Sequence, residues 1–352
     1  MKTIVLATAL LASTLASAQG IRITSKPAAH RVDVTIDGQP FTSYLWDTNQ
    51  RKPVLYPLIA PDGTTVTRGY PFKPLPGERV DHPHHAGLWF NYGNANDLDY
   101  WNNSDAIKPE ERHKYGTILH EKVLLARSGK DSGELDTESL WYPGGEPKPK
   151  PGTQPVLRQR TRYVFSRVTV DGQPARALDL VVTLTALSPV TFHDDKEGML
   201  GMRVAQFLES PNEKNGIFFD ANGKPTTVNG ASPGATGVYR SSEGRTGDAV
   251  WGTRGSWCVL TGQTTDKKTE TIAILDHSLN PGSPTYWHAR GYGLFAANPL
   301  GAHIFDPTVA PFNFTLDKGK SATFRYRILI LSSPITDKAM NDQESAFVKL
   351  YH

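Results

Sequence analysis

Three histidines stand within four positions in the segment "DHPHHAGLWFNYG" (residues 81–93), although the chain of 352 residues has only 11 histidines. Pro83 and Gly87 disfavour a regular helix, so the segment is expected to be a loop or an irregular strand. Imidazole is the side chain that gains and loses a proton near neutral pH. Such a cluster predicts either acid–base chemistry or metal binding, unless the histidines only pack a loop.

Three interpretations of the cluster stay open. His84 or His85 can act as a general acid or base, oriented by Asp81 or another carboxylate. His82 precedes a proline and is expected to be extended, which would project His82 and His84 to one side as two ligands for zinc or another divalent cation. No Glu or His follows within ten residues to serve as a third ligand. In the third interpretation the histidines are merely hydrogen-bonded in a packed loop.

A second segment, "DHSLNPGSPTYWHARGYGLFAANPLG" (residues 276–301), holds the same kinds of side chain. His288 adds an imidazole, Arg290 can bind a carboxylate or vicinal hydroxyl groups through its planar guanidinium, and Trp287 offers a flat apolar face. Two distant segments of matching chemistry predict opposite walls of one cleft. The alternative is a tryptophan–histidine corner that packs a loop.

A carboxylate partner for the histidines is expected in "FHDDKEGMLGMRVAQF" (residues 192–207). Glu197 ends a charged turn between strands, and Arg203 further along can keep it ionised. A charged turn can equally be a solvated one. The segment "VWGTRGSW" (residues 250–257) adds Trp251 and Arg254, an aromatic side chain beside a cation, with a core tryptophan as the alternative.

The sequence thus predicts two groups of site residues. The predicted catalytic residues are His84, His85, Glu197 and His288. The predicted substrate-binding residues are Asp81, Trp89, Arg203, Trp251, Arg254, His277, Trp287, Arg290 and Asn298. Neither a metal nor another cofactor is predicted, with a divalent metal on His82 and His84 as the alternative.

Composition narrows the class of partner. The formal net charge is +3 and the lysines and arginines are scattered, so neither nucleic acid nor an anionic membrane is an expected partner. Aromatic residues make up 10% of the chain, which favours a small-molecule carbohydrate, because sugar rings stack on such side chains. The chain contains no phosphate-binding loop of the Gly-x4-Gly-Lys type.

Residues 1–18 have the pattern of a secretory signal peptide. Lys2 precedes the apolar run "IVLATALLASTLA", and small residues lead to a cleavage site near Ala18. The run is too short for a comfortable membrane span, so the mature protein is predicted to be periplasmic or secreted. Cys258 is the single cysteine, and its apolar surroundings predict a buried residue rather than a reactive thiol.

Strand patterns dominate the elements that must position these residues. The heptapeptides "VTIDGQP" (residues 34–40) and "VTVDGQP" (residues 168–174) each predict a hairpin that turns at Asp-Gly. The one clear helix is expected near the C-terminus, where Asn341 and Glu344 resemble a capping box. We therefore expect an all-β fold in which residues 19–352 form one large antiparallel β-sandwich with few short helices.

The motifs "DHPHHAGLWFNYGNANDLDYWNNS", "DDKEGMLGMRVA" and "VWGTRGSW", with the segment from residue 276 to residue 306, resemble a family of exported bacterial proteins of unknown function labelled "PmoA-like" after a methane-oxygenase subunit. The resemblance spans roughly residues 25–333. It implies a supersandwich similar to the galactose-mutarotase group, whose members use a histidine with a carboxylate on a sugar ring. By that analogy His84 or His85 would pair with Glu197, and His288 and Arg290 would hold the substrate.

Three functions follow as hypotheses. The first is a periplasmic carbohydrate-active enzyme: an epimerase, lyase or hydrolase acting on a sugar or oxidised glycoside. The second is a non-catalytic carbohydrate-binding protein, and the third is a metalloenzyme built on His82 and His84. The first two require the histidine segment, the Glu197 turn and the His288 segment to meet in one pocket.

Overall fold

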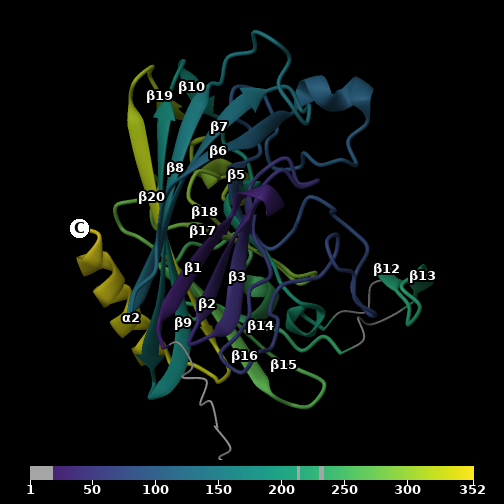
Figure 1. Ribbon diagram of the computed structural model, residues 1–352. Helices are drawn as coiled ribbons and strands as arrows, with labels where there is room; N and C mark the ends of the chain where they lie inside the picture. Colours follow the sequence, from purple (N-terminus) through teal and green to yellow (C-terminus); the bar gives the residue numbers. More distant parts are fainter. Residues whose placement is uncertain (1–18, 212–214, 230–233) are drawn as a thin grey trace, which may run out of the picture.

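Two eight-stranded antiparallel sheets form the body of the protein (Figure 1). The computed structural model describes residues 19–211, 215–229 and 234–352, so the predicted signal peptide, residues 1–18, lies outside the described residues. In the part of the chain that is described, no helix is both long and apolar enough to cross a membrane. The predicted fold class, a large antiparallel β-sandwich with few short helices, is confirmed.

The first sheet carries the candidate site. Its strands follow the order β1-β2-β3-β4-β5-β11-β18-β17. Their bounds are β1 (Ile21–Lys26), β2 (Arg31–Ile36), β3 (Gln39–Leu45), β4 (Val54–Leu55), β5 (Leu88–Tyr92), β11 (Gly198–Arg203), β18 (Leu294–Asn298) and β17 (Tyr286–Arg290). Segments distant in the chain, β5, β11 and β17–β18, are therefore neighbours in space.

The second sheet packs against the inner face of the first. Its order is β14-β15-β16-β20-β9-β8-β7-β6. The strands are β14 (Val238–Ser241), β15 (Trp257–Gln263), β16 (Thr269–Asp276), β20 (Ser321–Leu331), β9 (Gln173–Ala186), β8 (Leu157–Val170), β7 (Ser132–Pro143) and β6 (Gly116–Arg127). Helix α2 (Asp337–Leu350) covers its outer face, with Met340 and Phe347 in a second apolar cluster (Figure 1).

The remaining elements are short. The small strand pairs are β10 (Val190–Phe192) with β19 (Phe314–Leu316), and β12 (Gly216–Phe219) with β13 (Pro225–Val228). The short helices are η1 (Pro27–Ala29), η2 (Pro109–Lys114), η3 (Gln206–Leu208), η4 (Gly247–Val250) and α1 (Ala302–Phe305). Figure 1 shows the β12–β13 hairpin standing out from the body of the protein.

Both Asp-Gly hairpins are present as predicted. Asp37 and Gly38 join β2 to β3, and Asp171 and Gly172 join β8 to β9. All four residues have positive φ, from 51° to 77°, which is the backbone of the tight turn that suits a right-handed strand twist. Local turn chemistry was sufficient to place these hairpins.

The C-terminal helix begins earlier than predicted. Thr336, not Asn341, is the N-cap, and its hydroxyl accepts a hydrogen bond from the backbone N–H of Ala339 at 3.2 Å. Asn341 lies inside the helix, where its side chain accepts a hydrogen bond from Trp257 at 2.9 Å. A tertiary contact explains the polar residue that the sequence pattern mistook for a cap.

The main apolar core lies between the sheets. Strand residues alternate between this core and the opposite face, because successive side chains of a strand point to opposite sides. On β17, Trp287 and Ala289 enter the core, and Cys258 of β15 is fully buried there, as predicted. A smaller apolar cluster, which includes Trp89 and Leu294, covers the opposite face of the first sheet. That face carries the candidate site.

Candidate functional site

A cavity of about 570 Å³ opens on the outer face of the first sheet; we call it the histidine cavity. Its residues come from the loop before β5, the loop after β5, the turn before β11, strand β17 and the β17–β18 turn. The lining residues are His82, His85, Asn102, Asp195, Lys196, Glu197, His288, Arg290 and Tyr292. The three segments that the sequence placed in one cleft do share a cavity.

The histidine loop differs from the extended chain expected at its start. His82 has a left-handed backbone, with φ of 42°, and its carbonyl accepts the backbone N–H of His85 at 2.9 Å. The resulting turn gathers all three imidazoles instead of splitting them between two sides. Ring centroids lie 4.9 Å apart for His82 and His85, 5.6 Å for His82 and His84, and 4.3 Å for His84 and His85.

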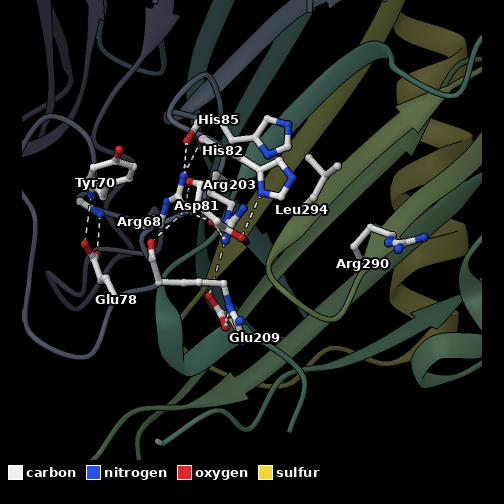
Figure 2. A network of polar contacts seen from close by, with 12 residues as sticks. Arg68, Tyr70, Glu78, Asp81, His82, His85, Arg203, Glu209, Arg290 and Leu294 are labelled. Carbon is white, nitrogen blue, oxygen red and sulfur yellow. Dashed lines mark hydrogen bonds and ion pairs between the residues drawn. The ribbon is translucent and has the colours of Figure 1, made fainter. Parts of the chain in front are cut away.

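A buried arginine causes this turn. Arg68, 1% exposed, donates to the carbonyls of His82 and His85 at 3.0 and 2.9 Å. It also donates to the carbonyl of Asp81 and to its Oδ1 atom, at 3.0 and 2.6 Å (Figure 2). Because one guanidinium satisfies several backbone acceptors of the loop, the tertiary contact overrides the local preference for an extended chain.

Asp81 is held as a carboxylate between two arginines. Its Oδ1 atom also accepts from Arg203, which is 0% exposed, at 2.7 Å. Although burial raises the pKa of the Asp81 carboxyl, the charges of Arg203 and Arg68 and a hydrogen bond from His82 together hold that pKa well below its usual value. Asp81 therefore stays ionised at neutral pH.

The other carboxylate oxygen orients His82. Asp81 Oδ2 lies 3.0 Å from His82 Nδ1, so a neutral His82 donates its Nδ1–H to Asp81 (Figure 2). The lone pair is then on Nε2. The His82 side chain is 40% exposed and lines the cavity, which makes it an oriented proton acceptor.

A stack of four rings fixes the plane of His82. Its ring lies parallel, within 4°, to Tyr292 on one side and to His85 on the other, at centroid distances of 5.0 and 4.9 Å. His85 in turn stacks on Trp89 at 5.2 Å. Offset stacking of this kind limits ring rotation.

The tautomer of His85 is fixed by Trp101. The indole Nε1–H of Trp101 donates to His85 Nε2 at 3.0 Å, so the proton of the neutral ring is on Nδ1. Burial, helped by the charges of His84 and Arg203, keeps the pKa of His85 well below its ordinary value. Nδ1 finds no hydrogen-bond partner within the described residues, which leaves His85 a donor for a ligand.

Glu197 and His288 form a second pair on the cavity wall. Glu197 Oε2 lies 3.7 Å from His288 Nδ1, too far for a hydrogen bond, and neither atom has another hydrogen-bond partner in the described chain. Burial raises the pKa of Glu197 against the opposing effect of Lys196, whose Nζ is 3.0 Å from Oε1. Burial, together with the charge of Arg290, lowers the pKa of His288 to about 3. A ligand hydroxyl placed in the cavity beside the pair, rather than between its members, can reach both atoms within hydrogen-bond distance.

A second cavity, about 440 Å³, adjoins the first, and we call it the Trp251 cavity. It shares Arg290 and Tyr292 with the histidine cavity, and Asp81, predicted to bind substrate, lines it together with Trp251. The guanidinium carbon of Arg290 lies 5.5 Å from the centroid of Trp251 and 5.8 Å from that of Tyr292.

Several residues predicted to contact substrate instead support the site from below. Trp89 is 2% exposed and packs under His85, while Arg203 is covered by Tyr292 at 4.9 Å. Asn298 donates to the carbonyl of Asp195 at 2.7 Å and so fixes the turn that carries Glu197. His84, predicted to be catalytic, is absent from the lining of the histidine cavity and packs against the other imidazoles.

The structure places three further residues predicted to contact substrate outside both cavities. Trp287 is fully buried in the core between the sheets, because β17 turns it away from His288. His277 packs on Phe347 of α2, at 5.2 Å, beside the second sheet. Arg254 is exposed and bonds the carbonyls of Pro284 and Gly282 at 2.9 and 3.0 Å, so it holds a loop and lines neither cavity.

The described residues supply no further ligand for the metal alternative. Over residues 19–211, 215–229 and 234–352, no three or more His, Cys, Asp and Glu side chains form a group that could hold a metal ion. The His82 ring meets the His84 ring at 80°, and its Nδ1 is bound to Asp81.

Sequence reasoning missed several supporting residues. Arg68 shapes the histidine loop and Trp101 fixes the tautomer of His85, and both lie outside the four segments that hold the predicted site residues. Lys52 is 3% exposed and donates to the carbonyls of His84 and Trp101 at 2.9 and 3.2 Å; burial lowers its pKa to about 7. Trp101 and Asn102 belong to the quoted family motif, and that was the one signal available for them.

Three solved structures have a distant likeness to this protein. A provisionally identified aldose 1-epimerase from Escherichia coli K12 has 10% identity and a TM-score of 0.33, covering 89% of this chain and 99% of its own. The Slr1438 protein from Synechocystis sp. PCC 6803 has 10% identity and a TM-score of 0.31, covering 95% of this chain and 100% of its own. A provisionally identified kojibiose phosphorylase from the human microbiome has 10% identity and a TM-score of 0.29, covering 95% of this chain and 36% of its own. At these values the likenesses do not bear on activity.

No curated protein matches the sequence significantly. A family model described as "Family of unknown function (DUF6807)" matches residues 31–344. That description carries no methane-oxygenase label. The matched range includes every residue of the two cavities and most of both sheets. The chain therefore belongs to the DUF6807 family of unknown function.

Proposed function

We propose that this protein is an enzyme that performs acid–base chemistry on a sugar or glycoside bound in the histidine cavity, as an epimerase, lyase or hydrolase. One observation carries the proposal: an imidazole oriented by a carboxylate, His82 on Asp81, lines the same cavity as Glu197, whose buried Oε2 atom has no hydrogen-bond partner among the described residues. Acid–base catalysis needs one group to accept a proton and another to supply one.

His82 is the proposed base. The partly buried carboxylate of Asp81 accepts the Nδ1–H and leaves Nε2 as the acceptor, an arrangement that also stabilises the imidazolium formed when Nε2 takes a proton. Arg68 and Arg203 keep Asp81 ionised throughout. This role falls to His82 rather than to His84 or His85, because His84 is absent from the cavity lining and Nε2 of His85 is occupied by Trp101.

Glu197 is the proposed acid. A raised pKa lets a carboxyl keep its proton closer to neutral pH, which is what a group that protonates a sugar oxygen requires. His288, held neutral by burial, offers a second proton acceptor 3.7 Å away. Donors that remain open on the wall, among them His85 Nδ1, can bind ring hydroxyl groups.

The cavity suits a ligand with several hydroxyl groups. Its volume of about 570 Å³ lies within the range usual for small-molecule sites. Amide, ammonium and guanidinium groups line it, from Asn102, Lys196 and Arg290. We also propose that the protein acts outside the cytoplasm, which rests on the signal-like pattern of residues 1–18 alone.

The test is turnover of a panel of sugars and glycosides, followed by mass spectrometry and by NMR. His82→Gln and Glu197→Gln are each expected to lower kcat at least a hundredfold while binding survives. His113→Gln, at an exposed histidine of η2, is the matched control and should match the wild type. Full turnover in both site variants would end the proposal.

A non-catalytic carbohydrate-binding protein is the second candidate. The observation in its favour is the position of Arg290 over the rings of both Trp251 and Tyr292, a cation–aromatic cluster of the kind that binding sites use. In that case the same two variants would weaken binding, and no panel member would change its mass or its NMR spectrum with the wild-type protein.

A further inference from the structure

Arg290 differs from the other arginines around the two cavities. Arg68 and Arg203 share the carboxylate of Asp81, and Arg79 lies 3.5 Å from Glu209. The guanidinium of Arg290 makes neither a hydrogen bond nor an ion pair with any described residue, and Figure 2 shows it apart from the connected network. Its N–H donors are open to a ligand.

The side chain is nevertheless held in place. Trp251 and Tyr292 contact the guanidinium through their ring faces, which fixes its position without using its donors. Tyr292 also packs against the His82 ring, at a centroid distance of 5.0 Å, and against the Arg203 guanidinium, at 4.9 Å. Arg290 is the last residue of β17, so its backbone belongs to the sheet. The donors are thus preorganised.

Nearby acids do not neutralise Arg290. Asp81 is engaged by Arg68 and Arg203, and Glu197 pairs with Lys196. Asp195 accepts the backbone N–H of Glu197 at 2.8 Å. Asp248 lines the Trp251 cavity but forms no ion pair with Arg290.

We propose that Arg290 binds the carboxylate of an acidic sugar, a hexuronate or a hexuronate glycoside, at the junction of the two cavities. The planar guanidinium matches a carboxylate through two parallel hydrogen bonds, and an anion would supply the missing counter-charge. Because Arg290 also lines the histidine cavity, a sugar held by its carboxylate has its ring beside His82 and Glu197. The inference rests on the proposed function for the choice of sugars.

The experiment compares acidic and neutral sugars by isothermal titration calorimetry. Glucuronate and galacturonate are titrated beside glucose and galactose into the wild-type protein, Arg290→Gln and Arg290→Lys. We expect the wild type to bind the hexuronates at least about tenfold more tightly than the hexoses. Arg290→Gln should lose this preference, and Arg290→Lys, which keeps the charge without the planar fork, should keep part of it.

Arg254→Gln is the matched control. Arg254 also lies over an aromatic ring, Tyr286 at 5.1 Å, but its donors are bonded to backbone carbonyls outside the cavities. This variant should retain the full hexuronate preference. Equal affinity for acidic and neutral sugars, or no binding of either hexuronate by the wild type, overturns the inference.

The binding readout separates this inference from the proposed function, because it requires no turnover. His82→Gln should keep the hexuronate preference. If the wild type prefers hexuronates through Arg290 yet alters no sugar, the proposed enzyme fails and the carboxylate subsite stands. If neutral sugars are turned over and Arg290→Gln leaves affinity unchanged, the subsite fails and the enzyme stands.

Discussion

Trp101 Nε1 donates a hydrogen bond of 3.0 Å to Nε2 of His85, and both side chains are buried. The bond dictates which nitrogen of His85 carries the proton. Trp101→Phe keeps an aromatic ring but leaves a buried imidazole nitrogen unsatisfied, so the free energy of unfolding should fall by about 1–3 kcal/mol. Urea denaturation measures this. Trp251→Phe, at a 39% exposed tryptophan, should change stability by less than about 0.5 kcal/mol.

Asp81→Asn should be among the most destabilising changes at the site. The substitution leaves Arg68 and Arg203 buried without the carboxylate that they share. Breaking a buried ion pair from one side costs about 3–5 kcal/mol, and denaturant unfolding at pH 7 checks it. Asp248→Asn, at the edge of the Trp251 cavity, is the control. A loss no greater than the control's would show that the arginines do not depend on Asp81.

The same carboxylate predicts a dependence of stability on pH. The pKa of Asp81 is lower in the folded protein than its usual value of 3.8. The ionised Asp81 carboxylate therefore contributes its full stabilisation of the fold above pH 3.8. The contribution should be lost as the pH falls below the usual value toward the folded pKa. Unfolding followed at a series of acidic pH values should show a smaller slope for Asp81→Asn than for the wild type. Parallel curves would contradict the prediction.

The effect of Glu197→Gln on the free energy of unfolding should change with pH in the direction opposite to the effect of Asp81→Asn. Burial raises the pKa of Glu197, so the folded wild type loses stability as the pH rises through that pKa. Glutamine does not ionise, so the stability of the variant relative to the wild type should increase from acidic to neutral pH. Loss of the ion pair with the exposed Lys196 should reduce this increase only slightly. Thermal unfolding at both pH values measures the difference, and a gain at acidic pH alone would refute the assignment.

Gly201→Ala should disturb the floor of the site. A Cβ atom on Gly201 would lie 2.5 Å from the Trp89 ring and 2.7 Å from the Trp101 ring. Both rings are buried against the histidine loop, so the clash should cost about 1–3 kcal/mol and loosen His85. Gly291→Ala, whose nearest contact would be 3.3 Å, should cost less. Denaturant unfolding and the histidine NMR signals report the two effects.

The sequence was informative wherever the chemistry is local. Alternating apolar residues and Asp-Gly turns predicted antiparallel strands and both hairpins, because period-two burial and positive φ are properties of short segments. Residue type also marked out Glu197, His288 and Arg290, which do line one cavity. These side chains were recognisable because they gather in motifs of unusual composition.

Tertiary structure decided what each histidine can do. Arg68, from a loop outside the motifs, folds the histidine turn, and so His82 faces Asp81 and the cavity instead of extending toward a metal. Trp287 and His288 are neighbours in sequence, yet the pleat of β17 puts one in the core and the other in the site. Burial, charge pairing and strand register depend on contacts between segments far apart in the chain. These three properties determine the protonation and orientation of each side chain, whereas the sequence composition determines only which chemical groups are available.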